Sequence, residues 1–225
     1  MRFWNDTVIE PVPPDSILAK FSAKFGIELP EYYEQLLQEY NGAKPLETAF
    51  DVMMGGKKHT FCIDRFLGIL PKNVPEPLNA YDVYETMVLL QEQTYPDVDH
   101  PKCDLLPIAV LFDGDLVCLD YRKGTPTVCI WSHEESQPGD PVTYHVADSF
   151  NAFINGCYEE TEYRDHSDVT LCDNLNENIR QDEIPCGYIW HFTEKQGEAQ
   201  LVPFLLHMAY PHTGGRAPGM WADYR

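Results

Sequence analysis

Basic residues are scarce in this sequence of 225 residues. There are 16 lysines and arginines against 36 aspartates and glutamates, which gives a net charge of −20. Such a surface repels phosphate backbones, so we do not expect direct binding of nucleic acid. It favours encounter with a basic protein partner, because complementary fields accelerate association. The plain alternative is that the acidic charge serves solubility alone.

Long apolar runs and paired cysteines are also missing. No stretch approaches the roughly 18 apolar residues of a membrane span, and the first residues lack an apolar segment of signal-peptide length. The seven cysteines contain no CxxC pair, which argues against a disulfide framework and against a thiolate zinc site. Because 44% of the residues are hydrophobic, the chain can bury a sizeable core. We expect a cytoplasmic protein with reduced thiols and no membrane partner.

Catalytic motifs are absent from the first 160 residues, which contain no GxGxxG, P-loop or nucleophile elbow. The run Gly55–His59 lacks the Walker spacing and is better explained as an exposed hairpin turn. His133 and Glu134 are expected in a solvated loop, since no third group orients the histidine. Another set of acidic residues misses the EF-hand spacing, so turn-forming or partner-facing roles are expected. This set is Asp97, Asp99, Asp104, Asp113, Asp115 and Asp120.

The hydrophobic spacing predicts helices and strands in a defined order. Helices are expected over 15–25, 31–40 and 82–93. Gly26 is expected to cap the first helix, and Asn41 and Gly42 are expected to end the second. Short strands are expected near 49–52 and 60–63, and further strands over 106–112, 116–121, 127–131 and 142–146. An N-capped helix over 148–154 closes the series.

Short sequence motifs within these elements resemble those of the SUKH superfamily, known from bacterial immunity proteins and fungal regulators of cell-wall synthesis. The resemblance covers residues 15–156 and departs at Ala43, where the family often has a second glycine. It implies an α+β domain with a mixed, mainly antiparallel sheet and helices packed around it. It also implies that this domain binds a partner protein and catalyses no reaction. Its carriers are Leu29, Pro30, Tyr32, Asn41, Gly42, Leu106–Ala109, Gly114, Asp115, Leu119, Asp120, Val128, His133, Glu134, Ser149, Phe150 and Phe153.

A second set of motifs lies near the C-terminus and resembles the WHH branch of HNH-type toxin nucleases. That family carries a Gly-Tyr-x-Trp-His-His run, a Gln-Leu-Val-Pro run, a following histidine and a His-x-Gly-Gly run. The matching residues here are Gly187–Phe192, Gln200–Pro203, His207 and His212–Gly215. The resemblance implies a small ββα-metal finger, with strands over 188–192 and 199–202 and a short helix that begins at Pro203.

The resemblance also implies roles for individual residues. His191, His207 and His212 match the metal ligands, and three imidazoles with an open fourth position suit a catalytic zinc. Phe192 stands at the position of the general base, and a phenyl ring cannot accept a proton. Losing a general base typically costs 10²- to 10⁴-fold in rate. The alternative is that the three histidines are ordinary polar residues, since a non-catalytic segment need not keep its ligands.

We therefore divide the chain into a SUKH-like domain (1–157), an acidic linker (158–182) and a degenerate WHH/HNH-nuclease-like tail (183–225). The leading hypothesis is a non-enzymatic immunity protein, or antitoxin, of a contact-dependent or polymorphic toxin system, which binds and neutralises a basic nuclease toxin. One alternative is a metal-dependent endonuclease of the HNH/WHH type, and another is a protein-interaction module unrelated to toxins. No catalytic residue is assigned, and the toxin-binding surface and oligomeric state stay open. Whether the tail is a recombination relic or a working part stays open too.

Overall fold

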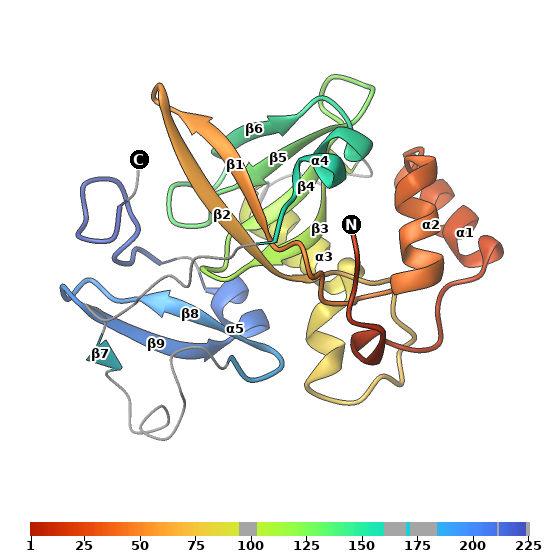
Figure 1. Cartoon of the computed structure of the whole chain (residues 1–225), viewed down its shortest axis with the longest axis horizontal. Helices are drawn as coiled ribbons and strands as arrows, with labels where there is room; N and C mark the ends of the chain where they lie inside the picture. Colours follow the sequence, from red (N-terminus) through yellow and green to blue (C-terminus); the bar gives the residue numbers. More distant parts are fainter. Residues whose placement is uncertain (95–102, 160–169, 172–183, 211, 224–225) are drawn as a thin grey trace.

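The computed structural model describes residues 1–94, 103–159, 170–171, 184–210 and 212–223, and a six-stranded sheet forms its centre (Figure 1). Neighbouring strands in the sheet are consecutive in the chain, and every pairing is antiparallel. The α+β fold with a mainly antiparallel sheet is thereby confirmed. The strands are β1 (Ala49–Met54), β2 (Lys57–Phe66), β3 (Leu105–Leu111), β4 (Leu116–Asp120), β5 (Thr127–Trp131) and β6 (Thr143–Ala147).

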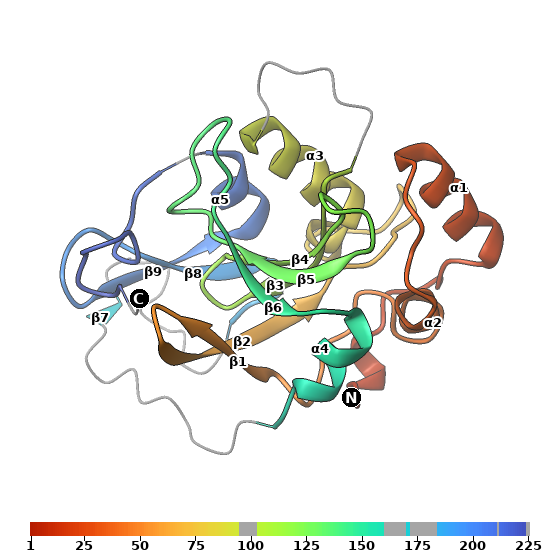
Figure 2. The same cartoon turned by 90° about the horizontal axis from the view of Figure 1, so that it is seen from above.

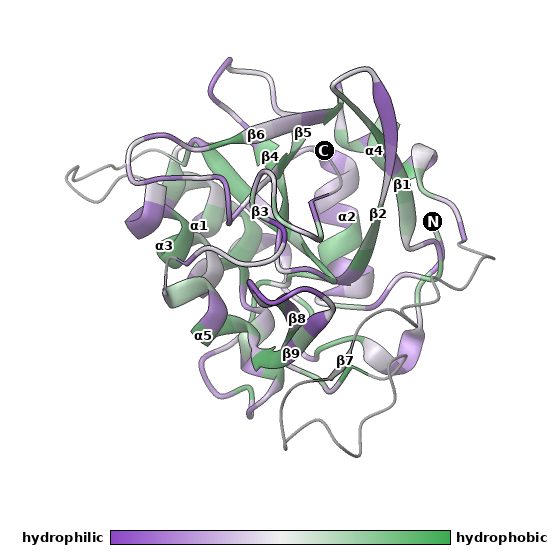
Figure 3. Ribbon diagram, turned by 90° about the vertical axis from the view of Figure 1, so that its left-hand side faces the viewer, coloured by the Kyte–Doolittle hydropathy of each residue, from purple (hydrophilic) through white to green (hydrophobic). Residues whose placement is uncertain are grey.

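The middle strands are almost entirely apolar because both of their faces are covered. All seven residues of β3 are buried, as are the first four of β4 and the last four of β5. Edge strand β1 instead alternates between buried and exposed residues over its second half, as a strand with one solvated face does. Figure 3 shows the same contrast, with hydrophobic colouring on β4 and β5 and hydrophilic colouring at the tip of the β1–β2 hairpin.

Helices cover the sheet on both sides. Figure 2 shows α3 and α5 together on one side of the central strands and α4 on the other. Gly26 ends α1 in the left-handed region, at φ 64°, as its position predicted, and the Ser149 side chain caps α4 by accepting from the Ala152 amide. Within α1, Ile17 follows the helical spacing but is exposed. The helices are α1 (Asp15–Phe25), α2 (Glu31–Tyr40), α3 (Val83–Thr94) and α4 (Phe150–Gly156), with 3-10 turns at Asn5–Thr7 and Leu78–Tyr81.

The tail forms the expected ββα unit. Strands β8 (Tyr188–Phe192) and β9 (Glu198–Pro203) pair antiparallel, and α5 (Phe204–Ala209) follows directly. A short strand, β7 (Thr170–Leu171), pairs in parallel with β9. It falls within the predicted acidic linker, most of which lies outside the described residues.

The tail shares a core with the N-terminal region (residues 1–157). Ile189, Phe204 and Met208 are almost completely buried and belong to the same apolar cluster as the central sheet. The tail's own cluster has only three buried members, Trp190, Ala199 and Leu201. A backbone hydrogen bond from the Trp190 amide to the Phe112 carbonyl, 3.2 Å, joins the two regions. The tail is thus held in place by packing against the N-terminal region.

Two further expectations concern thiols and membrane spans. Cys103, Cys118 and Cys129 are buried thiols that form no disulfide, and Cys172 lies outside the described residues. Within the part of the chain that the structure describes, no helix has the length and apolarity needed to cross a membrane.

Candidate functional site: a histidine cluster between the two regions

The three histidines predicted as ligands come together. His191 lies on β8, His207 on α5, and His212 just beyond that helix. His191 Nδ1 is 3.4 Å from His207 Nε2 and 3.2 Å from His212 Nε2. The ring centroids of His207 and His212 are 4.3 Å apart. The ββα unit therefore brings together one ring nitrogen from each of the three histidines.

Hydrogen bonding and burial leave these imidazoles with free lone pairs. The Nδ1 of His212 lies 2.7 Å from the Tyr210 carbonyl, which can only accept, so Nδ1 carries the proton and Nε2 has the lone pair. Burial is the main reason that the pKa values of His191, His207 and His212 are lowered, that of His191 to about 4. All three rings are therefore neutral near pH 7, which is the form that binds metal.

A fourth histidine, His133, joins the cluster from the N-terminal region. Its ring centroid is 4.6 Å from that of His207 and 5.5 Å from that of His212. The prediction of a solvated loop at His133 and Glu134 was wrong, because the tail covers this loop and leaves only 7% of the His133 side chain exposed. The predicted lack of an orienting group was also wrong, since His133 Nδ1 lies 2.7 Å from the Asp115 carboxylate.

Asp115 and His133 form a buried ion pair. Burial alone disfavours charge on both groups, but their mutual hydrogen bond and attraction outweigh it, so the pKa of His133 is raised and that of Asp115 is lowered. A signal for this pair was present in the sequence. The antiparallel hairpin of β4 and β5 places Leu116 opposite Trp131, so the residues just beyond these two positions meet at the same end of the sheet.

Further polar contacts join the tail to the same end of the sheet. Asp113 Oδ2 pairs with Arg216 Nη1 at 3.1 Å, and the Gly214 amide donates to the Glu134 carboxylate at 3.2 Å. As predicted, Asp113 and Asp115 lie in the turn between β3 and β4, where the Asp113 carboxylate accepts from the Asp115 amide; both residues are also buried. Asp120 pairs with Arg122 at 2.7 Å, while Asp97 and Asp99 lie outside the described residues.

Phe192 lies away from the histidine cluster (His133, His191, His207 and His212). Because neighbouring residues of a strand face opposite sides, Ile189 and His191 face the N-terminal region, while Trp190 and Phe192 face the tail's small core. The Arg216 guanidinium lies 4.5 Å from the centroid of the Phe192 ring. This ring is packed as an apolar residue and carries no group that could accept a proton.

Comparison with known families matches both regions. Residues 13–156 match the SMI1 / KNR4 family (SUKH-1). The chain belongs to this family. Residues 180–222 match a second family, described as a nuclease of the HNH/ENDO VII superfamily with conserved WHH. No curated protein matches the chain significantly. Both resemblances predicted from the sequence are therefore confirmed.

The histidine cluster fits the metal on which nucleases of the WHH type depend. Its donors are imidazole nitrogens, which suit zinc and other borderline transition metals. Potential ligand atoms of His133, His207 and His212 all lie within 4.8 Å of one another. His133 Nε2 is buried without a hydrogen-bond partner and lies 3.6 Å from Glu134 Oε1. A bound metal ion would act there as a Lewis acid or as a structural link between the two regions.

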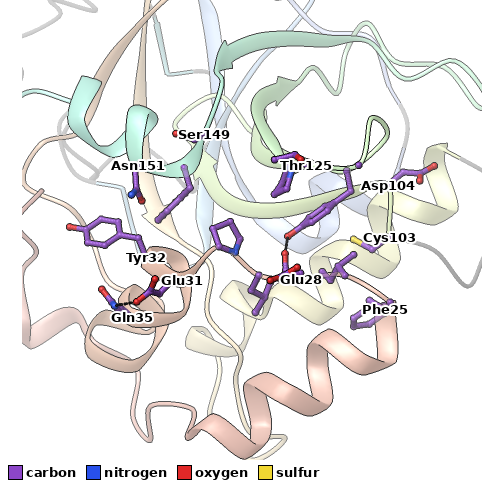
Figure 4. A pocket seen from close by; sticks show the side chains of 18 residues that line it. Phe25, Glu28, Glu31, Tyr32, Gln35, Cys103, Asp104, Thr125, Ser149 and Asn151 are labelled. Carbon is purple, nitrogen blue, oxygen red and sulfur yellow. Dashed lines mark hydrogen bonds between the residues drawn. The ribbon is translucent and has the colours of Figure 1, made fainter.

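A separate groove of about 920 Å³ lies in the SUKH-1 part of the chain, between α1, α2, the β4–β5 turn and the start of α4 (Figure 4). Among the described residues that line it, Glu28, Glu31 and Asp104 are the charged ones, and all three are acidic. Its lining also includes residues that carry the SUKH resemblance, namely Leu29, Pro30, Tyr32, Ser149 and Phe150. The sequence did not predict this groove.

Proposed function

We propose that this protein is a cytoplasmic immunity protein that binds and neutralises a basic nuclease toxin of a contact-dependent or polymorphic toxin system. Membership of the SUKH-1 family carries the proposal, and the net charge of −20 supports it. A strongly acidic protein attracts a nuclease, whose surface must be basic to bind DNA or RNA. Neutralisation by binding needs no catalytic residue in the immunity protein.

The acidic groove is the surface to which we assign the toxin. The end of the sheet near the histidine cluster is covered by the tail, whose Ile189 and Phe204 are fully buried in the shared core. The groove is open, and Tyr32 at its edge is 42% exposed. Exposed aromatic side chains beside complementary charge are typical of residues that dominate binding energy at protein interfaces. Binding there would cover the toxin's basic surface and exclude its substrate.

The proposal is tested with the full chain and the toxin domain encoded beside its gene. Wild-type protein is expected to retain that domain in a pull-down and to rescue growth of cells that express it. The double variant Glu28→Lys/Glu31→Lys reverses the charge of the groove, and we expect it to weaken binding at least 10-fold, mainly through slower association. The measurement is surface plasmon resonance at two salt concentrations.

A matched control changes the net charge equally at another place. Glu92→Lys/Asp140→Lys alters two exposed acidic residues outside the groove lining. We expect this variant to bind within about 3-fold of the wild type, because screened charges away from an interface contribute little. Equal losses in both double variants would exclude the groove as the binding surface. Failure of the wild type both to bind and to rescue would exclude the immunity function.

A metal-dependent endonuclease is the second candidate, and the WHH match favours it. The packing of Phe192 and the burial of His207, 7% exposed, oppose it. We expect no nicking of plasmid DNA by the wild type with added divalent metal. If the wild type does nick DNA and His191→Ala abolishes the activity, the protein is an enzyme. The variant Phe192→His restores the family residue and shows whether loss of the base is what silences the site.

A further inference from the structure

We propose that His133 of the N-terminal region completes a metal site with His191, His207 and His212 of the tail, and that Asp115 positions His133 for this role. The metal ion would be a divalent transition metal that prefers imidazole, zinc being the best suited. This site differs from a three-histidine nuclease site, because one ligand comes from the SUKH-1 part of the chain. The proposal does not depend on toxin binding.

Two distances between ring nitrogens of the tail histidines match those between the ligands of a tetrahedral ion. At a zinc–nitrogen distance of about 2.0–2.1 Å, two ligand nitrogens of a tetrahedron are about 3.3–3.4 Å apart. His191 Nδ1 lies 3.4 Å from His207 Nε2 and 3.2 Å from His212 Nε2. Hydrogen bonds alone do not explain this arrangement, because His191 Nδ1 carries at most one proton and has two nitrogen neighbours at long distances.

His133 can supply a fourth imidazole, since its potential ligand atom lies within 4.8 Å of those of His207 and His212. Its Nδ1 is held by Asp115 at 2.7 Å, so the nitrogen available for a metal is Nε2. That atom is buried and has no hydrogen-bond partner. A carboxylate that accepts from the other ring nitrogen is a common second partner of histidine ligands, because it fixes the tautomer and raises the basicity of the ligand. On binding, the ion takes the Nε2 lone pair and the Nε2 proton leaves to solvent, while the Nδ1 proton stays with Asp115.

The glycines beside the cluster allow the two regions to approach closely enough. A β-carbon at Gly114 would lie 3.0 Å from His207 Cε1, and one at Gly214 would lie 2.6 Å from Glu134 Oε1 and 2.9 Å from His191 Cε1. The backbone of the N-terminal region at Gly114 thus passes directly against His207 of the tail, and the tail backbone at Gly214 passes directly against Glu134 of the N-terminal region. A metal held by both regions would tie the tail to the sheet and leave no open position for water or phosphate.

The test uses the full chain, stripped with a chelator and titrated with Zn²⁺ and Co²⁺. We expect one ion per chain, measured by elemental analysis, and a visible Co²⁺ absorption spectrum of the tetrahedral type. X-ray absorption of the zinc form is expected to show four imidazoles. A count of three imidazoles would overturn the assignment of His133, and failure of the wild type to bind either metal would overturn the site.

Variants separate the four-histidine site from one confined to the tail. His133→Ala is expected to weaken Zn²⁺ binding at least 100-fold and to alter the Co²⁺ spectrum, and Asp115→Asn to weaken binding 10- to 100-fold while keeping the spectrum tetrahedral. The control is His145→Ala, which removes an exposed histidine of β6. Circular dichroism of the metal-free variants shows that they fold. If folded His133→Ala binds zinc as tightly as His145→Ala, the proposal is wrong.

Discussion

The N-terminal region and the tail reach stability by different means. The six-stranded sheet buries its own central strands. In contrast, the tail's own apolar cluster has three buried members among the described residues, and its Ile189, Phe204 and Met208 lie in the other region's core. A unit of about 40 residues rarely holds itself together without disulfides, metals or a partner surface. The tail, a segment that resembles a nuclease, therefore folds here as an extension of a SUKH-1 protein.

The substitution with the largest expected effect tests whether the tail and the N-terminal region share one core. Phe204 is fully buried on α5, and Phe204→Ala should lower the free energy of unfolding by about 3–5 kcal/mol, because it leaves a cavity in the common core. Urea denaturation followed by circular dichroism should show a single transition at lower urea. Leu206→Ala on the same helix is the control, since Leu206 is 53% exposed and its loss should change stability by less than about 0.5 kcal/mol. A separate early transition, with the main one unchanged, would contradict a shared core.

Much of the fold follows from local pattern, and the sequence predicted it. The spacing of Phe21 and Phe25, the glycine at position 26 and the serine at position 149 are local signals, and each element they predicted is present. The sequence also predicted the ββα unit of the tail. It could not predict how the tail docks, because docking depends on which buried surfaces meet and no local period encodes that. Ile189 alternates with Trp190 in the same way whether its side faces solvent or a neighbouring core.

The candidate site was predicted in part for the same reason. His191, His207 and His212 belong to one motif, so a resemblance could bring them together. His133 lies 58 residues before His191 in the numbering and belongs to another family's pattern, so it was interpreted as solvated. Its partner Asp115 was predicted in a turn and lies there, but its ion pair with His133 was not predicted. The burial of both groups exists only once the two regions are packed, so the pattern of neither region alone encodes it.

The second effect tests the contact between the regions at Gly114. Gly114 and Gly124 have nearly equal backbone angles, φ +90° and +94°, so alanine at either position costs about 1–3 kcal/mol of backbone strain. Only at Gly114 would the new methyl group meet the tail, 2.7 Å from Ile189 Cδ1. We expect Gly114→Ala to be about 1–3 kcal/mol less stable than Gly124→Ala, because the methyl group overpacks the contact. Thermal denaturation of both variants gives this difference, and equal stabilities would mean that the tail is not packed against this turn.

The smallest expected effect concerns the difference between two short helices, α4 of the N-terminal region and α5 of the tail. Helix α4 has a capping side chain, Ser149, whose oxygen accepts from the Ala152 amide at 3.1 Å, while α5 has Pro203 at its N-cap position and no side-chain cap. Ser149→Ala should therefore cost about 1 kcal/mol of unfolding free energy, and Ser149→Asn, which keeps an acceptor of similar strength, should cost almost nothing. Urea denaturation measures both. Because α5 lacks such a cap, its order depends on the packing of Phe204 and Met208. We therefore expect Phe204→Ala to lower the free energy of unfolding more than Ser149→Ala does. Equal losses in Ser149→Ala and Ser149→Asn would show that the hydroxyl matters for packing and not as a cap.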